Sequence, residues 1–325
     1  MSTIIALQDR DLAFDMFLKN LGNMNLTERL RRSDKIIIKP NLTGGSYLSE
    51  SSGAITSKDL VERLIGYVTR ISPNAEVFIL ESDSINSDHA YLKFERQNYG
   101  ELVERYSQVR LYDATRNALR DIPFQGFHFK KAIRLAEIFD TPFFFISLAK
   151  VKTHGKAVYT GVLKNQFGCF FPMDKSAYHT KMGKVISDIN SFIRPDLSIL
   201  EMSPAMEGNG PLYGEKVDVG LIFMSDNPLA LDLLLAKKTG LNRYNIRYLK
   251  FCKASMKNIY SIQADTIVNE DLLNLIPKFK YIPLWNRLII KTGIIIQKIG
   301  WIIEIVGKKI QTMGGKRHES KTEAK

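Results

Sequence analysis

Short runs of aliphatic and β-branched residues alternate along the chain with segments of helical periodicity. The run Asp34–Pro40 ends at a proline, and Ala75–Leu80 is a second run of the same kind. Both have the length and composition of buried strands. Between them, Ser57 precedes apolar residues at helical spacing, which predicts an N-capped helix. Strand, helix and strand in this order predict a βαβ unit with a right-handed crossover.

The same alternation continues to about residue 240. Further strands are predicted at Val109–Asp113, Phe143–Leu148, Asp196–Leu200 and Val217–Met224, and helices at Tyr91–Arg105 and Leu229–Thr239. These elements predict an α/β fold with a mainly parallel sheet flanked by helices. The segment from Ala157 to Met182 lacks helical periodicity, and we expect it to form an inserted cap or lid. No linker interrupts the pattern, so residues 1–275 are expected to form one α/β domain.

The pattern changes in the C-terminal segment, residues 276–313. Apolar residues share one side of a helical wheel there, and basic residues cluster on another side. No uncharged run reaches the ~18 residues needed to cross a bilayer. A helix of this kind, with Trp285 and Trp301, is typical of a membrane surface. A core helix or a dimer contact is the alternative, and residues 314–325 are expected to be disordered.

The charge distribution supports this interpretation of the tail. The formal net charge is +12, and the stretch Lys278–Arg317 holds nine Lys or Arg against one acid, Glu304. This stretch carries a net charge of +8, so most of the excess positive charge belongs to the tail, which argues against nucleic-acid binding by the domain. We expect an anionic membrane surface to be the partner.

The two cysteines, Cys169 and Cys252, are too few for an all-cysteine zinc site or an ordinary iron–sulfur cluster. Their number also indicates no disulfide framework, so a reducing compartment fits. The N-terminal residues show no signal-peptide pattern, because acidic residues interrupt them. We expect a cytoplasmic protein, peripheral on the inner face of the cell membrane.

Polar residues recur where the predicted parallel strands end. In open parallel sheets, ligands bind beyond the carboxyl ends of the strands. Lysines together with Asn and Thr side chains suit a phosphate or a carboxylate, because they replace the lost hydration of the anion. The residues expected to bind an anionic substrate are Lys39, Asn41, Lys150, Lys152, Thr153, Lys164 and Asn165. The alternative is a solvated loop with ordinary lysines.

Proton transfer and metal binding have separate candidates. His154 and His179 are acid–base candidates because imidazole titrates near neutrality. Glu207, in a glycine-punctuated turn, is a candidate general base or, with Asp226 and Asp232, a ligand for Mg²⁺. The alternatives are structural histidines, a solvated Glu207, and a structural or exposed Asp232.

Six sequence motifs, in order along about residues 35–245, resemble the domain-of-unknown-function family 362. They are Lys39–Leu42, Gly53–Thr56, Lys150–His154, Thr160–Gly168, Met206–Pro211 and Asp226–Asp232. The resemblance implies an α/β domain with these polar motifs as its site, and it implies no particular reaction. Many relatives carry ferredoxin-type cysteine runs, which this chain lacks, and members often have Asp at the position of Glu201.

Two functions fit these features. The first is an enzyme at the cytoplasmic membrane face that acts on a phosphate- or carboxylate-bearing, or lipid-linked, substrate. The second is a non-catalytic membrane adaptor that binds a metabolite or a partner. A redox accessory role is disfavoured by the cysteine count.

Overall fold

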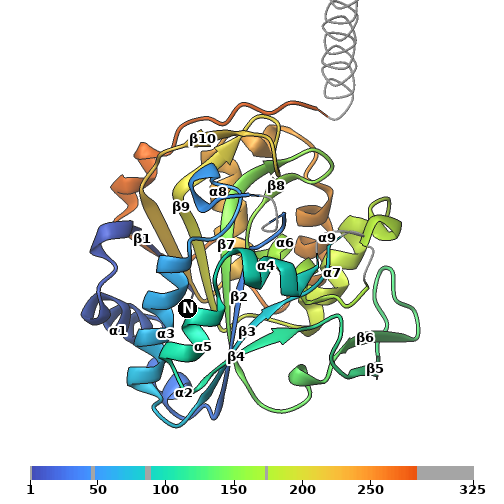
Figure 1. Cartoon of the computed structure of the whole chain (residues 1–325). Helices are drawn as coiled ribbons and strands as arrows, with labels where there is room; N and C mark the ends of the chain where they lie inside the picture. Colours follow the sequence, from blue (N-terminus) through green and yellow to red (C-terminus); the bar gives the residue numbers. More distant parts are fainter. Residues whose placement is uncertain (1, 45–47, 85–88, 173–174, 284–325) are drawn as a thin grey trace, which may run out of the picture. The chain divides into compact units, whose positions relative to one another are not determined.

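The structure, a computed structural model, describes residues 2–44, 48–84, 89–172 and 175–283 (Figure 1). Within these residues the chain builds a ten-stranded sheet with a separate two-stranded hairpin. The order across the sheet is β12 (Thr266–Val268), β1 (Thr3–Gln8), β11 (Leu221–Ser225), β9 (Leu197–Glu207), β7 (Phe144–His154), β2 (Lys35–Pro40), β3 (Glu76–Glu81) and β4 (Val109–Asp113).

Most of this sheet is parallel, as the sequence predicts. Strands β9, β7, β2, β3 and β4 run in one direction. Strand β11 runs antiparallel to both of its neighbours, β9 and β1. The predicted α/β class is therefore confirmed, with a mixed sheet. Strand β1 was not predicted from the sequence, because its position depends on pairing with β11, more than two hundred residues away.

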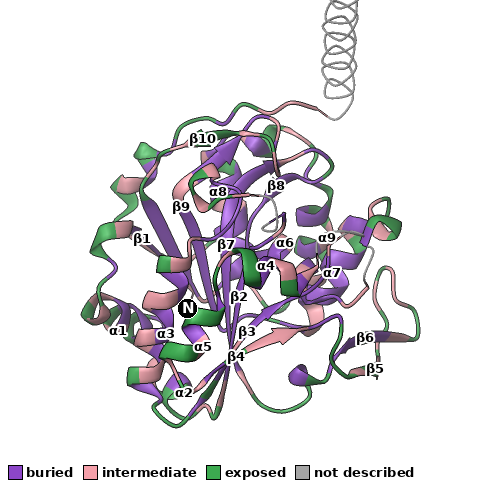
Figure 2. Ribbon diagram, in the orientation of Figure 1, coloured by how far each residue is buried: buried purple, intermediate pink, exposed green. Residues whose placement is uncertain are grey.

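The alternation of side chains along each strand divides the interior into two cores, one on each face of the sheet. On β2, Ile36 and Ile38 belong to one core and Ile37 to the other. The first core packs against α1 (Phe14–Asn23), α2 (Thr27–Arg31), α3 (Lys58–Ile71), α4 (Ala90–Arg96) and α5 (Gly100–Arg105). The second packs against α6 (Val162–Asn165), α7 (Met182–Phe192), α8 (Pro228–Lys238) and α9 (Arg247–Met256). Figure 2 shows the buried strands between partly exposed helices.

The helix boundaries follow local signals. The Ser57 side chain accepts a hydrogen bond from the Leu60 N–H and caps α3, as predicted. The Asn227 side chain caps α8 in the same way, and Pro228 is the first helical residue. The predicted helix over residues 91–105 is instead two helices, α4 and α5, because Asn98 adopts a left-handed conformation with φ of 52°.

Strands β7 and β9 continue beyond their predicted ends at Leu148 and Leu200. A short antiparallel strand, β8 (Val158–Thr160), pairs with the end of β7, and β10 (Glu215–Val217) pairs with the end of β9. These partners supply the hydrogen bonds that let the polar ends remain extended. The polar motif from Lys150 to His154 therefore lies within a strand rather than a loop.

The predicted cap segment, residues 157–182, contains β8, α6 and short 3₁₀ turns, with residues 173–174 not described. Tyr159, Leu163 and Cys169 within it are buried in the second core. The separate hairpin consists of β5 (Leu119–Pro123) and β6 (Ala132–Ala136), at the lower right of Figure 1.

The compact α/β unit extends to Tyr281, beyond the predicted boundary at residue 275. Phe279 is buried, and its N–H donates to the Thr239 carbonyl at 2.8 Å. Of the predicted C-terminal helix, residues 284–313 lie outside the described residues, as does the predicted disordered tail. Among the residues that are described, no helix is long and apolar enough to cross a bilayer.

Candidate functional site

Five buried lysines gather around the carboxyl ends of β2, β3 and β7. Each has at most 4% of its surface exposed: Lys39, Lys93, Lys150, Lys152 and Lys175. Lysine is almost never fully buried unless it is paired, because an ammonium group loses much hydration energy on burial. The contacts of these five side chains therefore define the candidate site.

Lys39, at the end of β2, forms a buried ion pair with Glu81, at the end of β3, with 2.8 Å between Nζ and Oε2. Burial alone would raise the pKa of Glu81, but Lys39 and Lys93 outweigh burial and lower it. A Cβ atom at Gly168 would lie only 2.8 Å from Lys39 Nζ, so a larger residue here would displace the Lys39 side chain. Asn165 Nδ2 also donates to the Lys39 carbonyl at 2.9 Å.

Ser82, next to Glu81, joins two further lysines. Lys93 Nζ donates to the Ser82 carbonyl, and Lys175 Nζ donates to Ser82 Oγ, both at 2.8 Å. Burial, reinforced by the nearby Lys93 charge, lowers the pKa of Lys175 to about 7. The Lys175 amine therefore exists in both protonation states near neutral pH.

The second buried ion pair lies on the neighbouring strands β7 and β9. Lys150 Nζ lies 2.8 Å from Glu201 Oε1, and the Ser57 N–H at the start of α3 donates to Glu201 Oε2 at 3.2 Å. Burial lowers the pKa of Lys150 and raises that of Glu201, each opposed by the other charge. Lys152 Nζ donates to Asn41 Oδ1 at 3.1 Å and also contacts the Ala54 carbonyl.

Lys164, on the short helix α6, differs from these lysines. Its side chain is partly exposed, and within the described part of the chain it has no hydrogen bond or ion pair. Burial among surrounding protein atoms lowers the pKa of Lys164 to about 8. An unpaired, poorly solvated ammonium group favours an anionic partner.

Asp232 on α8 holds helix α6 in place. Its two carboxylate oxygens accept hydrogen bonds from the Val162 and Leu163 N–H groups at 2.8 and 2.9 Å. A Cβ atom at Gly161 would overlap Asp232 Oδ1, so glycine is required for this contact. Burial raises the pKa of Asp232 to about 7. Of the three roles left open for Asp232, the structure favours the structural one, because it caps α6.

A carboxylate–imidazole pair that the sequence analysis missed lies at the end of β3. His89 Nδ1 is 2.8 Å from Asp83 Oδ2, and Arg116 Nη1 is 2.8 Å from Asp83 Oδ1. Burial opposes ionisation of Asp83, but Arg116 and His89 together lower its pKa to about 2. With Nδ1–H donating to Asp83, the His89 Nε2 atom carries the lone pair, which is the arrangement a general base uses.

The buried face of α4 could have revealed Lys93. Ala90, Lys93 and Phe94 are the buried residues of this helix, and they recur at helical spacing in the sequence. No comparable local pattern distinguishes Lys175, which follows the undescribed residues 173–174.

The two predicted catalytic histidines lie in different surroundings. His154 Nδ1 accepts hydrogen bonds from the N–H groups of Lys156 and Ala157, at 3.1 and 3.2 Å, within the β7–β8 turn. His179 Nδ1 lies 3.1 Å from Lys156 Nζ and lines a separate cavity. None of the predicted substrate-binding residues is among the described residues that line this cavity.

Thr153 and Glu207 make structural contacts at the end of β9. Thr153 Oγ1 donates to the Gly208 carbonyl at 3.1 Å. Glu207 Oε2 accepts the Lys280 N–H at 2.7 Å, and Lys280 Nζ lies 3.4 Å from Oε1. Glu207 thereby connects the last residues of the α/β unit to its sheet.

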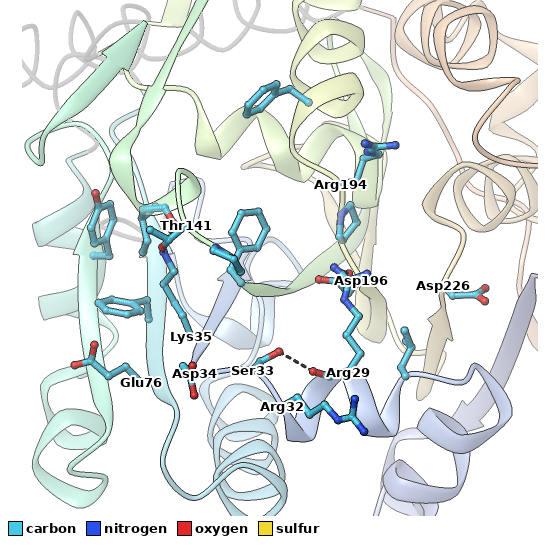
Figure 3. A pocket seen from close by; sticks show the side chains of 18 of the residues that line it. Arg29, Arg32, Ser33, Asp34, Lys35, Glu76, Thr141, Arg194, Asp196 and Asp226 are labelled. Atoms are coloured by element: carbon cyan, nitrogen blue, oxygen red, sulfur yellow. Dashed lines mark hydrogen bonds and ion pairs between the residues drawn. The ribbon is translucent and has the colours of Figure 1, made fainter. Parts of the chain in front are cut away.

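Asp226 lies at the opposite edge of the sheet from the lysines. Strand β11 is antiparallel, so Ser225 pairs with Ser198 near the start of β9. Asp226 lines a cavity of about 1490 Å³ together with Arg29, Lys35 and Asp196 (Figure 3). In the described ranges, no three His, Cys, Asp or Glu side chains are arranged to hold a metal ion. The Mg²⁺ site of Glu207, Asp226 and Asp232 stays a prediction.

Comparisons with known proteins agree with the motifs. The family described as Domain of unknown function (DUF362) matches residues 36–237. The thylakoid-associated protein sll1697 of Synechocystis sp. is 28% identical over an alignment of 229 residues, and the alignment covers 67% of this chain. The chain spans 66% of the length of that relative. Because the family match covers more than half of the chain and includes all six motifs, this protein belongs to the DUF362 family.

Proposed function

We propose that this protein is an enzyme that binds a phosphate- or carboxylate-bearing substrate at the carboxyl edge of its parallel sheet. The observation that carries the proposal is the absence of a carboxylate partner, within the described residues, for Lys164 and Lys175. A bound anion would offset both charges.

The surroundings of Lys164 support a ligand at this place. Gln166 is fully buried, and its Nε2 atom donates to no described group. A buried donor without an acceptor costs about 1–3 kcal/mol, so such groups persist where function requires them. Asp232 positions α6, which carries Lys164 and is followed directly by Gln166.

The proton-transfer step is proposed for His89, oriented by Asp83. The catalytic roles of His154 and His179 remain predictions. His89 and Lys175 belong to one network, because the Asp83 side chain contacts His89 and the Asp83 carbonyl accepts a hydrogen bond from Lys175. An imidazole beside a cationic anion-binding site is suited to general acid–base chemistry on a bound phosphate or carboxylate compound.

We further propose that the protein works at the cytoplasmic face of a membrane. The name of the Synechocystis relative associates that protein with thylakoids. The basic, amphipathic sequence pattern after Pro283 provides the means of attachment. Removal of residues 284–325, which retains Phe279 and Tyr281, is expected to abolish co-sedimentation with phosphatidylglycerol vesicles. Unchanged co-sedimentation would contradict the attachment.

Calorimetric titration of the full chain with inorganic phosphate and with malonate tests the anion site. Lys164→Met is expected to weaken binding of at least one probe about tenfold or more, a loss of about 1.4 kcal/mol. Lys237→Met, which removes an exposed charge on α8, is the matched control and is expected to change nothing. Equal affinities for the wild type and Lys164→Met would contradict the proposed site.

Turnover separates an enzyme from an adaptor. Native mass spectrometry of gently purified protein would identify a co-purified ligand, which is then incubated with fresh protein. We expect the wild type to convert this ligand and His89→Gln to bind it without converting it. A ligand that the wild type holds unchanged would indicate the adaptor.

A further inference from the structure

A second basic site lies apart from the carboxyl-edge lysines. A cavity of about 390 Å³ is lined by the first turn of α7, the start of α9 and the turn between β7 and β8. The basic residues of this cavity come from three segments that are distant in sequence. Lys156 comes from the β7–β8 turn, His179, Lys181 and Lys184 from the start of α7 and the residues just before it, and Arg247 from the start of α9.

The charge of this cavity has one sign. None of the described residues that line it is acidic. Lys181, Lys184 and Arg247 are exposed and have no carboxylate partner in the part of the chain that the structure describes. On a protein surface, cations are usually interspersed with acids, so this concentration of positive charge favours an anion.

The acidic side chain of α7, Asp188, makes its hydrogen bonds with the hairpin. It is buried, and its oxygens accept the N–H groups of Phe127, His128 and Phe129 at 2.7 to 2.9 Å. These bonds attach the β5–β6 hairpin to α7. The Asp188 carboxylate therefore accepts hydrogen bonds from the backbone of the hairpin and does not pair with the described surface lysines.

The start of α7 adds a favourable dipole. Lys181 is the N-cap residue, and in the described structure no side chain caps this helix. The first N–H groups of an α-helix carry partial positive charge and bind anions by donating hydrogen bonds to them. The partial positive charge at the start of α7 adds to the charges of the four Lys and Arg side chains that line the cavity, Lys156, Lys181, Lys184 and Arg247. Both features therefore favour an anion.

One wall of the cavity is aromatic. Phe127, at the hairpin, is 37% exposed and packs edge-to-face on Phe251 of α9, with 5.2 Å between ring centroids. An exposed phenylalanine beside a basic pocket offers apolar contact to the part of a ligand that adjoins its charged group.

We infer that this cavity binds the phosphate group of an organic phosphate, with Lys181, Lys184 and Arg247 holding the phosphate and Phe127 contacting the attached carbon chain. A phospholipid headgroup and a soluble phosphorylated metabolite share this chemistry. The site goes beyond the proposed function, because it shares no described lining residue with the Lys164 site.

The test uses the full chain and two probes, inorganic phosphate and dihexanoyl-phosphatidylglycerol below its micelle concentration. The variant Lys181→Ala/Lys184→Ala/Arg247→Ala removes three charges from the cavity. The control Lys250→Ala/Lys253→Ala/Lys257→Ala removes the same charge from exposed positions on and beside α9 that do not line the cavity. Circular dichroism checks that both variants remain folded.

We expect the cavity variant to weaken binding of at least one probe about tenfold, and the control to change it less than about twofold. Loss confined to the lipid probe, reproduced by Phe127→Ala, would identify a lipid headgroup. Equal loss of both probes would identify a soluble phosphate compound. Equal effects of the two triple variants, or no binding that depends on the cavity, would overturn the inference.

This outcome is independent of the anion site at the strand ends. Lys164→Met is expected to leave binding at the α7 cavity intact, and the triple variant is expected to leave binding at Lys164 intact. Failure of one site therefore does not imply failure of the other.

Discussion

The carboxyl edge and the amino edge of the parallel sheet differ in the balance and the burial of their charged side chains. At the carboxyl edge, five lysines are buried, while the described carboxylates paired with them are Glu81 and Glu201. At the amino edge, the cavity of about 1490 Å³ is lined by both signs, with Arg29, Arg32, Lys35 and Arg194 facing five acidic residues (Figure 3). The charges that line the amino-edge cavity are therefore close to balanced.

The two edges therefore differ in how far their charged groups are exposed to water. An exposed, balanced set of charges is hydrated by water and stabilises little. Buried lysines cost free energy that the fold must offset. The carboxyl edge is also where parallel strands, all pointing one way, bring their last residues together.

The largest expected contrast comes from breaking one ion pair at each edge. Lys39→Met leaves Glu81 buried without its partner and is expected to cost about 3–5 kcal/mol of unfolding free energy. Arg29→Met removes the exposed partner of Asp196 and is expected to cost about 1 kcal/mol. Urea unfolding of both variants measures the difference. Equal losses at the two edges would contradict the contrast.

The next effect concerns Asp232 and is pH-dependent. Its pKa is raised by burial to about 7, so the stabilisation it gives is present below about pH 4 and is lost as pH rises to 7. The wild type should therefore be more stable relative to Asp232→Asn at pH 5 than at pH 8. A difference that does not change with pH would contradict a raised pKa. Asp232→Ala, which removes both acceptors of α6, is expected to cost about 2–3 kcal/mol.

The smallest change in stability is expected at Lys164. Because burial lowers its pKa to about 8, the folded state binds this proton less tightly than the unfolded state, and stability rises between pH 8 and 10. Lys164→Met should stabilise the protein at pH 7 by about 0.5–2 kcal/mol while it loses phosphate binding. Arg194→Met at the amino edge is the control and should change stability by less than about 0.5 kcal/mol. Destabilisation by Lys164→Met would indicate a partner that the described residues do not reveal.

Local sequence signals predicted much of the parallel half of the fold. The strands β2, β3 and β4 lie within one residue of their predicted bounds, Pro40 ends β2, and Ser57 and Asn227 cap the starts of α3 and α8. The same signals placed Lys39 and Asn41 at a strand end, where the structure has them. They could not predict the extension of β7 and β9, because this depends on pairing with β8 and β10.

The sequence by itself determined the α/β class, the family and the lysine-rich motifs, because periodicity, turn residues and motif order are local properties. Only the tertiary structure decided which charges meet. Because β11 is antiparallel, Asp226 lies at the amino edge of the sheet and not at the carboxyl edge. Long-range packing brings Lys93, Lys175 and Glu81 together. Partner choice depends on strand register and on loops that cross between layers, and neither is encoded in any short segment.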